Sequence, residues 1–156
     1  MSGNFLATGL VWYVAFLFST TCHEAAHALA AKLGGDETAA LGGQVTLNPA
    51  PHIQREPFGT VLVPIITYMF GGWMMGWASA PYDPLWQARH PHRAAWMALA
   101  GPAANFVLLL IAVGLIHLGL SIGIFTIPEY LSFAEIVVPA TPGIWSGAAA
   151  LVSVLF

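Results

Sequence analysis

Charged residues are scarce in this sequence of 156 residues: 7% are Asp, Glu, Lys or Arg, whereas 58% are hydrophobic. A soluble globular domain carries roughly 25% charged residues, so this composition excludes an ordinary soluble domain and indicates an integral membrane protein in a lipid bilayer. The net charge of −3 gives no sign of a nucleic-acid partner. At this length we expect one membrane domain over residues 1–156.

Cysteine is almost absent, because Cys22 is the only residue of this type. No disulfide can form within the chain. We interpret Cys22 as a packing residue, since its neighbour His23 points to a different face of the same predicted helix. We do not expect residues 1–22 to be a signal peptide. No Lys or Arg precedes the first apolar run, and no small-x-small cleavage site ends it.

The apolar residues gather into four segments, which predict an all-α membrane protein with about three to four transmembrane helices. A span needs about 20 apolar residues, and the last segment is too short to cross. We therefore expect that it is incomplete and that the chain is the N-terminal part of a longer core. The predicted spans are about residues 5–33, 60–79, 94–120 and an incomplete one from residue 144.

Two polar stretches separate these spans. We predict that the first, residues 34–59, is partly extended, because residues 44–47 alternate polar and apolar side chains and prolines at 49 and 51 argue against a helix. Backbone of this kind cannot face lipid, so we expect it at the interface or against a protein cavity. The second, residues 80–93, is predicted to be a solvated basic loop, and residues 121–142 an interfacial excursion.

One polar run interrupts the first span, His23-Glu24-Ala25-Ala26-His27. A helix places residues four apart on one face, so the two imidazoles can bind one metal ion. This is the His-Glu-x-x-His pattern, in which two histidines bind Zn²⁺ and the glutamate is the general base for a metal-bound water. Ionisable groups at membrane depth are costly, which favours a functional role. The alternative is a histidine pair that binds haem or a pigment, for which the glutamate is not required.

Two further polar residues are candidates for the same site. Asn105 is an amide at hydrocarbon depth, which needs a hydrogen-bond partner. Its side chain either forms a hydrogen bond with a neighbouring helix or points into the metal cavity. His52 lies in a rigid proline-flanked stretch, where it is either a site residue or a loop histidine without a role.

Taken together, these residues resemble the site-2 protease family of intramembrane zinc metalloproteases, in its compact form. The resemblance covers about residues 5–120. It is specific because the motifs at residues 23–27 and 101–105 occur together, in this order, in predicted membrane segments. The matching stretches are residues 23–27 (His-Glu-Ala-Ala-His), residues 101–105 (Gly-Pro-Ala-Ala-Asn) and residues 46–52 (Thr-Leu-Asn-Pro-Ala-Pro-His).

The resemblance implies a role for each candidate residue. His23 and His27 would bind Zn²⁺, Glu24 would be the catalytic base, and Asn105 would position the substrate strand or the oxyanion. His52 would lie near the cavity. The implied activity is hydrolysis of a peptide bond in or near a transmembrane segment of a membrane-protein substrate, and the implied location is the bacterial inner (plasma) membrane.

The chain departs from the family pattern in one respect. The family takes its third zinc ligand from an Asp in a Leu-Asp-Gly motif on a later helix, and no Asp follows Asp83 here. Either that motif belongs to a longer polypeptide, or the site is incomplete, in which case His52 is the substitute ligand within this chain. An incomplete site favours the alternative function, a catalytically inactive, protease-like structural subunit of a larger membrane complex.

Overall fold

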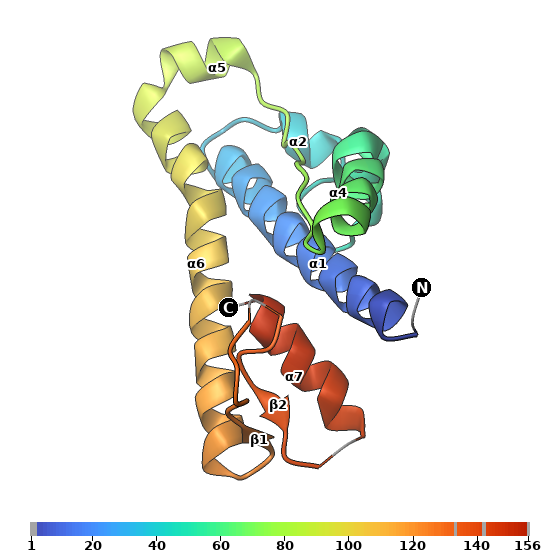
Figure 1. Cartoon of the computed structure of the whole chain (residues 1–156). Coiled ribbons are helices and arrows are strands. Elements are labelled where there is room, and N and C mark those ends of the chain that lie inside the picture. The colour runs from blue at the N-terminus through green and yellow to red at the C-terminus, as the bar shows by residue number, and fades with distance from the viewer. Residues whose placement is uncertain (1–2, 133, 142, 156) are drawn as a thin grey trace. The chain divides into compact units, whose positions relative to one another are not determined.

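A computed structural model describes residues 3–132, 134–141 and 143–155, and these are mostly helical (Figure 1). The chain forms two compact units, one of residues 1–16 and 107–156 and the other of Leu17–Phe106. In chain order the elements are α1 (Gly3–Leu33), α2 (Thr38–Leu41), α3 (Ala50–Arg55), the π-helical turn η1 (Phe58–Leu62), α4 (Val63–Gly71), α5 (Pro84–Arg89), α6 (Pro91–Ser121), β1 (Phe125–Thr126), β2 (Val138–Pro139) and α7 (Ile144–Leu155).

The two long helices, α1 and α6, contain 31 residues each. At 1.5 Å per residue each is about 46 Å long, more than the roughly 30 Å of a hydrocarbon core. Among the residues that the structure describes, Phe5–Leu33 and Pro91–Ser121 are long and apolar enough to cross a membrane, and only 17% of the most apolar window of each is buried within the protein. Their outward-facing apolar surface suits lipid, as the predicted spans 5–33 and 94–120 require.

The helices in the other two predicted segments, residues 60–79 and the incomplete one from residue 144, are too short to cross a membrane. The count of three to four spans is therefore not confirmed. The helical stretch Phe58–Gly71 ends well before residue 79, and Ile144–Leu155 has 12 residues. The first of these ends because Gly72 adopts a left-handed conformation (φ 76°), which terminates a helix. The residues up to Asp83 then run without regular secondary structure.

The stretch after α1 is more helical than we predicted. Residues 44–47 form no strand, and residues 50–55 are helical despite their prolines. Pro49 and Pro51 lie at the start of α3, where a helix has no partner for an N–H and proline is tolerated. The Asn48 side chain accepts a hydrogen bond from the Ala50 N–H (3.0 Å) and closes this turn. Position within a helix, not proline content, therefore decides the conformation here.

Asp36 connects the end of α1 to the start of α5. This buried side chain accepts hydrogen bonds from the Thr38 N–H (3.0 Å), the Thr38 hydroxyl and the Asp83 N–H (2.9 Å). Burial acts to raise the pKa of Asp36, but these hydrogen bonds outweigh it and hold the pKa below its ordinary value of 3.8. The ionised carboxylate is therefore the form that stabilises this connection.

We expect Asp36→Asn to lower the free energy of unfolding by about 1–3 kcal/mol, because the new amide N–H₂ would face a buried N–H donor. The folded-state pKa is depressed, so the stabilisation is present at neutral pH and is lost as the pH falls through that pKa. Thermal unfolding in detergent at decreasing pH measures this. The exposed Glu37→Gln is the matched control, and an Asp36→Asn protein as stable as wild type would contradict the assignment.

The unit of residues 1–16 and 107–156 has an apolar core of its own. Ile116, Phe125 and Val152 are among its buried members. Strands β1 and β2 pair antiparallel with Phe125 opposite Pro139, so the protein is not strictly all-α. The buried Ser153 hydroxyl accepts hydrogen bonds from two backbone N–H groups near β2. None of the predicted site residues lies in this unit.

Candidate metal and catalytic site

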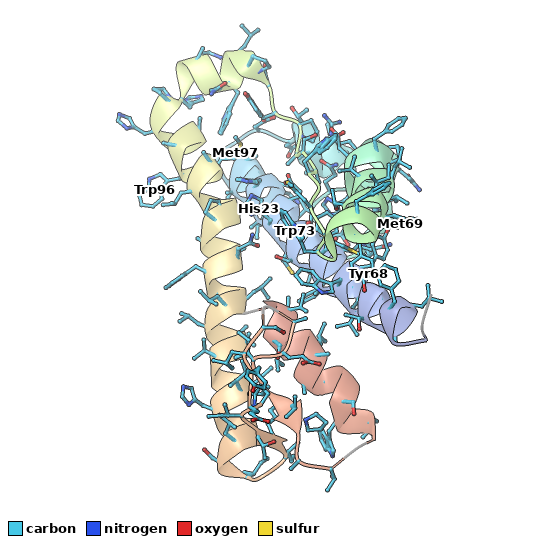
Figure 2. The ribbon with its side chains drawn as sticks, in the orientation of Figure 1. His23, Tyr68, Met69, Trp73, Trp96 and Met97 are labelled. Atoms are coloured by element: carbon cyan, nitrogen blue, oxygen red, sulfur yellow. The ribbon has the colours of Figure 1, made fainter. Side chains whose placement is uncertain are left out.

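The two histidines of α1 lie together, with ring centroids 4.7 Å apart at an interplanar angle of 75°. His27 Nδ1 lies 2.7 Å from the backbone oxygen of Met97 on α6, and Figure 2 shows the neighbouring Trp96 projecting outward from this helix. A carbonyl can only accept, so Nδ1 of His27 carries the hydrogen and the lone pair is on Nε2. Such a partner fixes a metal-binding histidine in its ligating tautomer.

Gly101 of α6 is where the two imidazoles converge. A Cβ at this position would overlap Nε2 of both His27 and His23, the latter at 2.5 Å. Any other residue would therefore occupy the space that both ring nitrogens face. The sequence singled out Gly101 only as part of the matching stretch at residues 101–105, and its place at the imidazoles was not predicted.

Glu24 and Asn105 line one cavity with His23. The cavity has a volume of about 260 Å³, and its walls are formed by Thr20, His23 and Glu24 of α1, residues 76–78 and Asn105 of α6. Glu24 is 6% exposed. Asn105 Oδ1 accepts a hydrogen bond from the Ser19 hydroxyl (3.4 Å). Asn105 therefore joins α6 to α1 and also faces the cavity, so both interpretations of this residue apply.

The cavity wall of residues 76–78 comes from the segment that we predicted as part of a helix. The Trp77 N–H donates to the Gly59 carbonyl (3.1 Å), and the Met75 N–H donates to the Thr67 hydroxyl (3.0 Å). A Cβ at Gly59 would overlap the Trp77 backbone oxygen and would lie 2.8 Å from its ring. This wall is thus held against η1 and α4 by a close backbone contact that requires glycine.

We expect Gly59→Ala to reduce any hydrolytic activity of this site by roughly 10-fold or more, because the added methyl group displaces the cavity wall of residues 76–78 and misplaces a molecule bound there. The zinc content should not change, since Gly59 does not touch either histidine. Gly147→Ala, whose Cβ meets nothing within 4 Å, is the control. Wild-type cleavage by Gly59→Ala would show that the position of this wall is unimportant.

His52 is buried, being 1% exposed. Its Nε2 lies 3.2 Å from the Thr46 carbonyl oxygen. Within the described part of the chain, no group of three or more His, Cys, Asp or Glu side chains is placed to hold one metal ion. The two convergent imidazoles of His23 and His27 suit Zn²⁺ as donors, and His52 as the third ligand stays a prediction.

A His-Glu-x-x-His motif on a helix is typical of zinc metallopeptidases, and here the helix is apolar and long enough to cross a membrane. The chain belongs to peptidase family M50, because the sequence profile of that family matches residues 11–154. This confirms the resemblance to the site-2 protease family.

A curated protein of Bacillus subtilis (strain 168) is similar to this chain. Named "Putative zinc metalloprotease YwhC", it is 33% identical over 96 residues, which are 61% of this chain and 40% of that protein. The chain thus spans about two fifths of the length of this relative. No solved structure matches the chain.

Proposed function

We propose that this protein is an intramembrane zinc metalloprotease of the bacterial inner membrane, which hydrolyses a peptide bond in or near a transmembrane segment of a membrane-protein substrate. The observation that carries the proposal is the convergence of His23 Nε2 and His27 Nε2 at Gly101, next to the cavity that Glu24 lines. Membership of peptidase family M50 supports the same chemistry.

Each site residue has a defined task in this mechanism. His23 and His27 would hold Zn²⁺, which when bound supplies Lewis-acid activation of water and of the scissile carbonyl. Glu24 takes a proton from the attacking water and delivers it to the leaving amine. The Asn105 side-chain N–H₂ donates to the oxygen on which negative charge develops, since its own oxygen already accepts from Ser19.

The second candidate is an inactive, protease-like subunit of a larger membrane complex. The lack of a three-ligand group among the described residues favours it. We do not favour haem or pigment binding, because Gly101 packs directly against the Nε2 atoms of both histidines. A visible absorption band of the pure protein would reverse that conclusion.

The proposal is tested with the full purified chain reconstituted in liposomes with a panel of single-span membrane proteins. We expect about one zinc per chain by mass spectrometry and cleavage that 1,10-phenanthroline stops and added zinc restores. A metal-free chain that cleaves none of the panel and copurifies with other membrane proteins would instead establish the structural subunit.

A further inference from the structure

A polar cluster beside Glu24 is not used by the mechanism above. It consists of Gln44, His52, Glu56 and Ser79, and we call it the His52 cluster. His52 is 1% exposed and Gln44 is 2% exposed. Glu24 interacts electrostatically with both His52 and Glu56, yet none of the four cluster residues lines the cavity that contains Asn105. The cluster therefore lies near Glu24 but does not form part of the cavity lining.

Hydrogen bonds link this cluster to the protein surface. The Ser79 hydroxyl donates to Glu56 Oε1 (2.6 Å) and accepts from Nε of the exposed Arg55 (3.2 Å). The Ser79 backbone oxygen accepts from Gln44 Nε2 (3.4 Å). The next backbone N–H along the chain, that of Ala80, faces Glu24. Ser79 thus joins Arg55, Glu56 and Gln44 by hydrogen bonds, one residue before the Ala80 N–H that faces Glu24.

Two buried acceptors in the cluster lack a protein partner. The Thr46 carbonyl engages His52 Nε2, so Nε2 carries the hydrogen and Nδ1 is an acceptor. His52 Nδ1 and Gln44 Oε1 are both buried without a hydrogen-bond partner among the described residues. Buried polar atoms are nearly always paired, and ordered water supplies the partner where protein does not. Each of these two acceptors can therefore take a hydrogen bond from an ordered water.

We propose that His52 is a positioning residue, which with Gln44 holds water beside Glu24 and passes it to the reaction cavity. The proposal rests on the proposed function, since each hydrolysis consumes one water: its OH joins the carbonyl carbon and its remaining hydrogen goes to the leaving nitrogen. It gives His52 a role other than that of zinc ligand.

The first experiment compares His52→Leu and His52→Gln, with the exposed His92→Leu as control. Leucine has no polar atom, so we expect kcat to fall about 10- to 100-fold with KM and zinc content unchanged. Glutamine can donate to Thr46 and accept from water, so it should restore most of kcat. Wild-type kcat in His52→Leu, an equal loss in His52→Gln, or loss of zinc in His52→Leu would overturn the proposal.

The second experiment needs no proteolysis. Radiolytic hydroxyl-radical labelling of the full chain in lipid nanodiscs detects side chains beside bound water. After correction for intrinsic reactivity, His52 should label about as fast as the exposed His92 and much faster than Phe125, which is buried in an apolar cluster. Protection of His52 equal to that of Phe125 would overturn the proposal. If His52 is labelled but the protein cleaves no substrate, the water site is supported and only the proteolytic function is refuted.

Discussion

Replacing Glu24 with glutamine is expected to reduce cleavage of a membrane-embedded substrate by about 100- to 10,000-fold, the usual contribution of a general acid–base group. Glutamine has nearly the same shape, and its carbonyl can still accept from the Ala80 N–H that faces this position. It cannot take a proton from water at neutral pH. The zinc content should stay at the wild-type level, because the imidazoles of His23 and His27 are untouched.

Two controls make this result interpretable. Glu37→Gln makes the same chemical change at an exposed position just after α1, and should cleave like wild type. Mass spectrometry of the metal content separates loss of chemistry from loss of the site. Full activity in Glu24→Gln would remove this carboxyl from the mechanism, and joint loss of zinc and activity would assign it a structural role instead.

Replacing Gly101 with alanine is expected to weaken zinc binding at least about 10- to 100-fold, and cleavage should fall in proportion. The methyl group would overlap Nε2 of both His23 and His27, so the rings must turn away from each other or α6 must move. Crowding a packed contact in this way is destabilising, whereas alanine in place of glycine favours a helix by about 1 kcal/mol.

Gly114→Ala provides the matched control in the same helix. A Cβ at Gly114 meets nothing within 4 Å, so this variant gains the helix preference without the overlap and should keep wild-type zinc content. Metal content and zinc affinity measured by titration would compare the two variants. A Gly101→Ala protein that binds zinc like Gly114→Ala would show that the imidazoles do not bind metal where they face Gly101.

Local patterns in the sequence identified the features that depend on near neighbours along the chain. The four-residue spacing of His23 and His27 places them on one helix face whatever surrounds that helix, and their rings do lie together. The long apolar runs likewise identified the two helices of span length, because length and hydropathy are properties of a segment. The same patterns led to the family. The segment around residues 60–79 was misjudged because hydropathy does not register where Gly72 ends a helix.

By itself, then, the sequence determined the apolar helical class, the His-Glu-x-x-His helix and the family. Only the tertiary structure placed Gly101 against the imidazoles, the Met97 carbonyl on His27 and Asn105 on Ser19. Those contacts join residues 70 or more positions apart, and no local periodicity encodes them. They arise because α1 and α6 pack closely, and that packing makes two histidines on a helix into a candidate metal site beside the carboxyl group of Glu24.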